Sequence, residues 1–369
     1  MVRGAVIASV VGVAAIASAG TAAFVMTRGP YSANNCPRFD STAVDVTASG
    51  ARAIPASATI GQLLVAHDRT GDASVVDLTT GRVTFIEVGL TEPHEVAVSS
   101  DGRWGAMSDF GDRKNRLFQG NRLAVIDMVA KRHARTIDLG ANRGAHGVVF
   151  VPGTSRALVT TQSSRTIVEV DVEKGAILGT FETRADGSHL VALSPDAKTV
   201  FSVNEGNGSV TRLDLATRRF DWQRVLGPAP SEGIAVTPDG RDLWVGTDVG
   251  GKVRILDAAT GAVRDSITGF RNPVRITITR DGKRAVIADR GCSHVVDVAS
   301  RRVLGEIPGY TGSFGVSGDG RIAFMEARAD GLVLIDLESR RVVTTYKLHN
   351  WAHGIAWGPS PVSDTAQRR

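Results

Sequence analysis

One apolar phrase restarts along the chain at intervals of about 40 residues, and it constrains the fold more than any other feature. Each copy opens with a variable residue, continues as a short apolar strand and usually reaches a turn. The copies begin at Pro93, Ala145, Ser188, Ser231, Pro273, Ser313 and Ala352, 39 to 52 residues apart. A unit of about 40 residues that holds four strands is one blade of a β-propeller. The sequence therefore predicts a repeat protein.

The inner detail of the units agrees. An Asp-Gly turn such as Asp239-Gly240 follows the first strand in several copies, and glycine supplies the positive φ that a tight hairpin needs. A later strand ends in an aliphatic-Asp pair in all seven units. These aspartates are Asp77, Asp127, Asp171, Asp214, Asp257, Asp297 and Asp336. Each precedes a turn, where an Asp side chain can accept backbone N–H groups, so we expect a structural role for them.

The two ends of the repeat region complement each other. The last copy supplies one strand, and residues 62–88 supply three strands with no opening strand before them. Joined, they make one more blade. We therefore predict an all-β fold over residues 59–360, a seven-bladed β-propeller of four-stranded blades closed by pairing of the N- and C-terminal strands. Such closure removes exposed sheet edges, and we expect a monomer.

The N-terminal residues predict export. Residues 5–26 carry no charge and follow Arg3, so residues 1–30 are expected to be a signal peptide or a membrane anchor. Ala17-Ser18-Ala19 offers a cleavage site, whereas the apolar run is long enough to span a bilayer, and both alternatives stay open. Either places the propeller outside the cytoplasm. Residues 31–58 are expected to be a polar tail and residues 361–369 a disordered C-terminal tail.

Cys36 and Cys292 are the only cysteines. In an oxidising compartment they could form a disulfide that tethers the N-terminal tail to the propeller. The absence of a Cys-x-x-Cys spacing disfavours a redox or metal role.

Three segments carry a family resemblance: Pro93-His-Glu-Val-Ala-Val-Ser99, Ser188-His-Leu-Val-Ala-Leu-Ser-Pro-Asp196 and Ser231-Glu-Gly-Ile-Ala-Val-Thr-Pro-Asp-Gly240. They resemble the YVTN-repeat, YncE-like β-propellers, from Ile60 to about Pro359. The resemblance implies the propeller fold and an extracytoplasmic location, but it selects no activity. The chain departs from the repeat at Thr160-Thr161-Gln162.

Polar residues gather at one predicted face of the propeller. The first strand of a blade lines the channel and the second runs back, so the start of strand one and the end of strand two meet. The first positions are His94, His146, His189, Glu232, Val274, Phe314 and His353, and the second positions are Asp68, Asp109, Gln162, Glu205, Asp248, Asp289 and Glu326. The histidines and Glu232 belong to five consecutive blades. We predict a channel mouth that binds a small-molecule or protein ligand through His94, His146, His189, Glu232, His353, Asp109, Glu205, Asp248 and Arg113.

Three interpretations of this mouth remain open. The first is ligand binding without a metal. The second is a divalent metal ion held by His94, His146, His189, Glu232 and His353, because imidazole and carboxylate suit zinc or a similar ion. Such an ion could support hydrolase or lyase chemistry of the lactonase kind. The third is structural: these residues cap strand ends and line a solvated channel. Strand parity, which places His94 on the same face as Val96 and Val98, allows an interblade position for some of them.

A basic insertion lengthens the first complete unit at residues 110–121. Arg113, Lys114, Arg116 and nearby Arg122 could make it a lid over an anionic ligand, or it could be a solvated loop. The formal net charge is only +5 and the charges are interspersed. No basic stripe interleaved with aromatics occurs, so we expect no nucleic-acid partner.

Overall fold

The computed structural model describes residues 60–361 except 113–118, 229, 249, 310–311, 328–330 and 349–351. The predicted N-terminal segment, the polar tail of residues 31–58 and residues 362–369 of the C-terminal tail lie outside the described residues. Every regular element in the described part is a strand, and none of its segments is a helix that could cross a membrane.

Six blades are continuous in sequence. Blade 1 holds β4 (Pro93–Val98), β5 (Trp104–Gly111), β6 (Gln119–Asp127) and β7 (Arg132–Asp138). Blade 2 holds β8 (Ala145–Phe150), β9 (Arg156–Thr161), β10 (Thr166–Asp171) and β11 (Ala176–Glu182). Blade 3 holds β12 (Ser188–Leu193), β13 (Thr199–Asn204), β14 (Ser209–Asp214) and β15 (Phe220–Val225). Blade 4 holds β16 (Ser231–Val236), β17 (Asp242–Thr247), β18 (Lys252–Asp257) and β19 (Val263–Thr268). Blade 5 holds β20 (Arg275–Ile278), β21 (Arg284–Asp289), β22 (Cys292–Asp297) and β23 (Val303–Pro308). Blade 6 holds β24 (Phe314–Val316), β25 (Ile322–Ala327), β26 (Gly331–Asp336) and β27 (Arg341–Tyr346).

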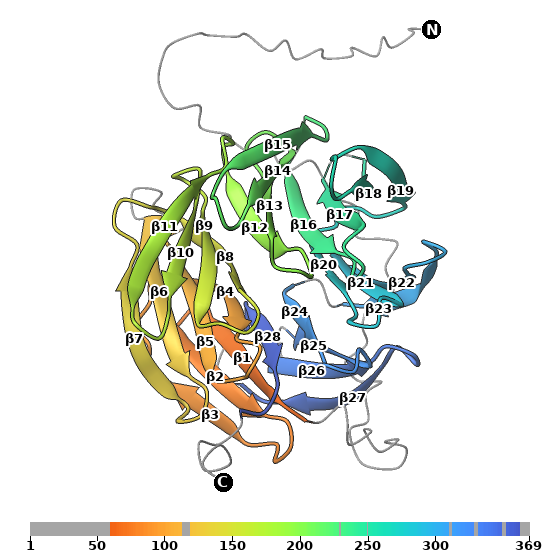
Figure 1. The fold of residues 1–369 in the computed structure, drawn as a ribbon. Helices are drawn as coiled ribbons and strands as arrows, with labels where there is room; N and C mark the ends of the chain where they lie inside the picture. Colours follow the sequence, from red (N-terminus) through yellow and green to blue (C-terminus); the bar gives the residue numbers. More distant parts are fainter. Residues whose placement is uncertain are drawn as a thin grey trace, which may run out of the picture. The chain divides into compact units, whose positions relative to one another are not determined.

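Blade 7 joins the two ends of the repeat region. Its order is β28 (Ile355–Gly358), β1 (Gln62–His67), β2 (Asp72–Asp77) and β3 (Val83–Ile86). The pairing of β28 with β1 is antiparallel, with Val65 opposite Ile355. The inner strands contact one another in the order β28, β4, β8, β12, β16, β20, β24 (Figure 1). The predicted seven-bladed, four-stranded fold and its closure are thus confirmed.

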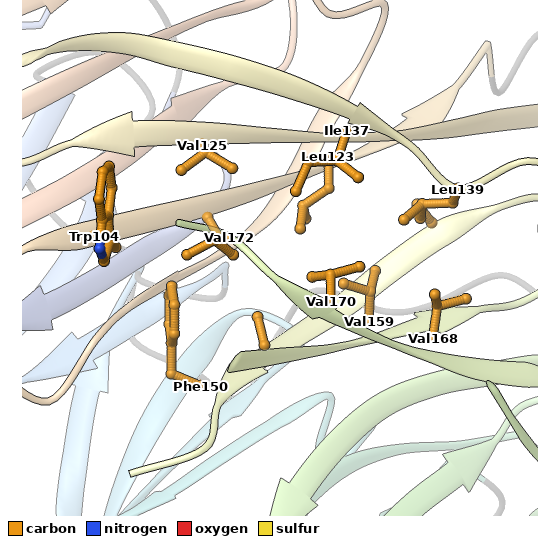
Figure 2. Close-up of a cluster of buried hydrophobic side chains, with 13 residues drawn as sticks. Trp104, Leu123, Val125, Ile137, Leu139, Phe150, Val159, Val168, Val170 and Val172 are labelled. Atoms are coloured by element: carbon orange, nitrogen blue, oxygen red, sulfur yellow. The ribbon is translucent and has the colours of Figure 1, made fainter. Parts of the chain in front are cut away.

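The hydrophobic core lies between adjacent blades. Trp104 and Val125 of blade 1 pack with Phe150 and Val170 of blade 2 (Figure 2). Similar clusters fill the other blade interfaces. Because both faces of a blade are covered, most residues of the second strands are buried, and β13 is buried along its whole length. Burying one Val, Leu or Phe side chain contributes roughly 1.5–3 kcal/mol, so stacking of blades supplies most of the driving force.

The seven repeated aspartates are structural, as predicted. Asp77 Oδ1 accepts the N–H groups of Thr79 and Thr80 at 3.1 and 3.0 Å, and the other six make one or both equivalent bonds. The residue four positions later always has a positive φ of 51–72°. These residues are Gly81, Lys131, Gly175, Arg218, Gly261, Arg301 and Arg340.

The basic members of that set connect blades. Lys131 Nζ lies 3.1 Å from Asp77 Oδ2 of the preceding blade. Arg218 reaches Glu169 in the same way. A left-handed conformation costs a non-glycine residue free energy, and these ion pairs across blade boundaries offset part of that cost.

Replacing Asp297 with asparagine is expected to reduce the acid sensitivity of the fold. A hydrogen bond from the Ser300 hydroxyl, then one from the Ser300 N–H, lowers the pKa of Asp297 below its usual value. A carboxyl with a lowered folded-state pKa stabilises the protein above its unfolded pKa, and that contribution is lost as pH falls through the folded pKa. Asparagine keeps an acceptor but does not titrate. Urea unfolding at pH 7 and pH 2.5 should show a smaller gap between wild type and Asp297→Asn at the lower pH. An equal gap at both pH values would contradict the prediction.

Candidate functional site

Four of the predicted mouth residues lie in β-bulges at the start of the inner strands of blades 1–4. In blade 1, Pro93 pairs with Asp109 and Val96 with Met107, so two residues of β4 oppose one residue of β5. Blades 2, 3 and 4 repeat this irregularity. The residue pairs in the four bulges are His94-Glu95, His146-Gly147, His189-Leu190 and Glu232-Gly233. A bulge re-aims side chains. The parity argument for His94 is therefore wrong, because the extra residue interrupts the alternation between His94 and Val96.

Hydroxyl groups on the second strand satisfy two of these bulges. The N–H of Glu95 donates to Ser108 Oγ at 3.1 Å. The N–H of Gly147 donates to Thr160 Oγ1 at 2.8 Å, and the same hydroxyl donates to the His189 carbonyl at 2.5 Å. The second bond crosses from blade 2 to blade 3. It couples the backbone positions of two mouth histidines.

Four histidines form a continuous row along neighbouring blades. Ring centroids are 4.2 Å apart between His353 and His94, 4.1 Å between His94 and His146, and 3.9 Å between His146 and His189. His94, His146 and His189 are only 3–5 % exposed. Phe110 lies against the row, 5.4 Å from His94 and 5.2 Å from His146 between centroids. The structure thus brings together the four histidines that the sequence analysis selected, and we call them the histidine row.

Carboxylates contact three members of the row. His94 Nδ1 lies 3.2 Å from Glu95 Oε1, and His189 Nε2 lies 3.1 Å from Glu205 Oε1. Glu205 also accepts a 2.5 Å hydrogen bond from Gln162. His353 Nδ1 lies 4.0 Å from Asp68 Oδ2. The sequence analysis did not select Glu95 as a site residue. Glu95 occupies the second bulge position, which is glycine in blades 2 and 4.

A second group of charges is centred on blades 4 and 5. Burial raises the pKa of Glu232, and nearby Asp248 raises it further, while Arg275 and Arg290 oppose the shift. Burial likewise raises the pKa of Asp248 against the charge of Arg290. Arg275 also pairs with Glu95, which links blade 5 to blade 1. The five predicted metal ligands therefore fall into two groups. Four are the histidines of the histidine row, whereas Glu232 lies near Asp248 and two arginines. We call Glu232, Asp248, Arg275 and Arg290 the acid–arginine group.

Asp109 has a structural environment. It is 1 % exposed and accepts the N–H groups of Thr91 and Glu92 at 3.1 and 3.0 Å. Arg122 Nε donates to its other oxygen at 2.9 Å. Asp109 thus anchors the loop before β4 and neutralises one cation near the insertion. Arg113, the predicted lid residue, lies outside the described residues.

Two clusters in the described part of the chain have ligand atoms close enough to hold a metal ion. Their atoms lie within 4.8 Å of one another in His94, Glu95 and His146, and in Asp289, Cys292 and His294. Cys292 is disulfide-bonded, so its sulfur is not a thiolate ligand. Its predicted partner, Cys36, lies outside the described residues. The first cluster is therefore the better metal candidate.

Comparison with known families decides where the chain belongs. The family model PQQ_2, described as outer membrane protein assembly factor BamB, matches residues 119–346, more than half of the 369 residues. The chain belongs to the PQQ_2 family. The match extends from β6 to the end of β27 and contains blades 2–6 whole. Sequence reasoning had named the YVTN-repeat propellers; the propeller fold is confirmed, and that subfamily is not.

Solved structures share the fold of this PQQ_2-family chain. One is described as Kuenenia stuttgartiensis hydrazine synthase, with 19 % sequence identity and a TM-score of 0.64. The likeness covers 82 % of this chain and 98 % of that one. At this identity it shows the fold alone. No curated protein matches the chain. The chemistry of the site therefore depends on this chain's own residues.

Proposed function

We propose that this PQQ_2-family protein is an extracytoplasmic propeller of the YVTN type that binds a small polar ligand at its mouth. The observation that carries the proposal is the histidine row, with neighbouring centroids 3.9–4.2 Å apart. Burying several polar rings costs free energy that apolar residues would avoid. A row confined to four of seven equivalent positions is not required by the repeat. Binding explains why these blades carry it.

The chemistry of the mouth favours a ligand that bears a carboxylate or phosphate group. Imidazoles both donate and accept hydrogen bonds, and Arg290 adds positive charge near Asp248, whereas Arg275 is paired with Glu95. Burial raises the pKa of Glu232 and of Asp248, so each holds a proton to higher pH and can donate it in a hydrogen bond. Perturbed carboxyl groups gather at functional sites more often than elsewhere.

A thermal-shift screen against small carboxylates and phosphates tests this function. A compound at 100 times its Kd adds about 2.7 kcal/mol of stability, which raises Tm by several degrees in a domain of this size. We expect such a shift in wild type and its loss in His146→Ala/His189→Ala. His133→Ala, on the outer strand β7, is the matched control and should respond like wild type. Equal shifts in the double variant, or no shift with any compound, would refute binding at the mouth.

A metal-dependent hydrolase or lyase of the lactonase kind is the alternative. The cluster of His94, Glu95 and His146 favours it, because a bound ion could polarise a carbonyl or acidify a water. Lactone hydrolysis that requires an added divalent ion and is abolished by His94→Gln would support the enzyme. Metal-independent ligand binding without turnover would support the first proposal.

The family description names an assembly factor, which makes protein binding a further candidate. The outermost strands expose apolar side chains, including Ile177 and Leu178 on β11 and Val303 and Leu304 on β23. A scaffold role would use such surfaces and would survive His146→Ala/His189→Ala. Loss of partner binding in that variant would instead place the partner at the mouth.

A further inference from the structure

The ring closure places two histidine nitrogens face to face. His353 Nε2 lies 3.1 Å from His94 Nε2, although the residues are 259 positions apart. The backbone N–H of His353 donates to the Ala66 carbonyl at 2.8 Å. A Cβ on the next residue, Gly354, would lie 2.5 Å from the His94 carbonyl oxygen. The backbones of both residues are thus closely packed, and the short separation between the rings is built into the fold.

The other nitrogen of each ring is directed to a carboxylate. Glu95 Oε1 lies 3.2 Å from Nδ1 of His94, and Asp68 Oδ2 lies 4.0 Å from Nδ1 of His353. An ionised carboxylate only accepts hydrogen bonds, so the His94 ring is expected to carry its proton on Nδ1. The 4.0 Å separation from Asp68 is too long for a hydrogen bond and does not fix the tautomer of His353. The Nε2 lone pair of His94 can therefore accept a hydrogen bond from His353 Nε2 or bind a cation between the two rings.

A zinc-class ion fits this arrangement. Zinc–nitrogen bonds of about 2.0–2.1 Å at tetrahedral angles separate two ligand nitrogens by roughly 3.3–3.4 Å, close to the observed 3.1 Å. A carboxylate on the far nitrogen is the usual support of a metal-binding histidine. His146 offers a further nitrogen within 4.8 Å of ligand atoms of His94 and Glu95. The positive charge of Arg275 disfavours a cation at this position, but the ion pair of Arg275 with Glu95 offsets most of that charge.

We propose that His94 and His353 bind a zinc-class divalent ion through their Nε2 atoms. Glu95 and Asp68 orient the two imidazoles. Imidazole ligands select Zn²⁺, Cu²⁺ or Ni²⁺ over Ca²⁺ and Mg²⁺. The proposal rests on the proposed function, because it identifies one species that the mouth holds. A shared proton between the two rings is the competing arrangement.

Calorimetric titration of the EDTA-treated, full-length protein with ZnCl₂ tests the site. We expect one Zn²⁺ per chain and no binding of CaCl₂. His94→Gln and His353→Gln should each weaken zinc binding by at least about 100-fold, and Glu95→Gln by about 10–100-fold as a positioning residue. His133→Gln should bind like wild type. Circular dichroism and urea midpoints establish that each variant is folded.

Two results would overturn the proposal: no zinc binding by wild type, or undiminished binding by His94→Gln/His353→Gln. The first result would leave the shared proton as the occupant. Failure of the metal site is distinguishable from failure of the proposed function. Carboxylate or phosphate binding that depends on His146 and His189 would persist without zinc, whereas zinc binding without any such ligand would remove the proposed function alone.

Discussion

Replacing Gly147 with valine is expected to lower the free energy of unfolding by about 3 kcal/mol and to displace His189. A Cβ at position 147 would lie 2.6 Å from the His189 carbonyl oxygen and 2.9 Å from the Leu190 Cα. These are backbone atoms of the neighbouring inner strand, so no side-chain rotation can relieve the contact. Overpacking of this kind costs about 1–3 kcal/mol, occasionally more. Urea unfolding measures the loss, and weaker ligand binding at the mouth would report the displacement.

Gly227→Ala is the matched control for this experiment. A Cβ at Gly227 would meet no atom within 4 Å, and its φ is not positive. The stability of Gly227→Ala should stay near that of wild type or rise by a few tenths of a kcal/mol, because alanine restricts the unfolded chain. If Gly147→Val were as stable as Gly227→Ala, the close approach of the inner strands would not constrain the mouth.

Removing both arginines that pair with Glu169 is expected to cost about 3–5 kcal/mol. Glu169 is 1 % exposed in the middle of β10. Arg156 of the same blade lies 2.7 Å from one carboxylate oxygen, and Arg218 of blade 3 lies 2.6 Å from the other. Gly179 makes room for Arg218, because a Cβ there would lie 2.6 Å from the guanidinium. Arg156→Met/Arg218→Met would leave a buried carboxylate without compensation, and urea unfolding would show the loss.

A triple variant separates the charge from the packing. Adding Glu169→Met to the double variant should restore most of the lost stability, because well-packed apolar residues often replace a buried ion cluster at little cost. Arg165→Met is the surface control. Arg165 and its partner Asp186 both have side chains that are 63 % exposed, so its loss should cost no more than about 1 kcal/mol. A triple variant as unstable as the double would mean that the arginines act by packing instead of charge.

Local patterns predicted the architecture because the repeat depends on interactions between residues that are close in sequence. An Asp that accepts N–H groups two and three positions later needs no distant partner, so all seven of these turns could be read from sequence. The starts of β4, β8, β12 and β16 fall on the predicted residues. Those of β20, β24 and β28 fall one to three residues later. The third-strand aspartates and the incomplete end units together predicted the closure of blade 7.

The candidate site was predicted in composition but not in geometry. Sequence placed His94, His146, His189 and His353 on neighbouring blades, and the structure confirms their proximity. The sequence could not show the bulges, because a bulge depends on how two strands pair and places almost no constraint on the residue types. For that reason the parity argument for His94 failed and Glu95 was overlooked. Asp109 was selected by position, yet one of its oxygens accepts backbone N–H groups of the loop before β4 and the other pairs with Arg122.

The sequence by itself determined the period, the number of blades, the turns and the four histidines at the mouth, because each can be read from the repeating pattern of about 40 residues. Only the tertiary structure decided which of those residues meet. The 3.1 Å approach of His94 and His353 and the pairing of Glu95 with Arg275 join residues 259 and 180 positions apart. Such contacts depend on closing the whole ring, where bulge geometry and blade packing set distances that no local pattern encodes.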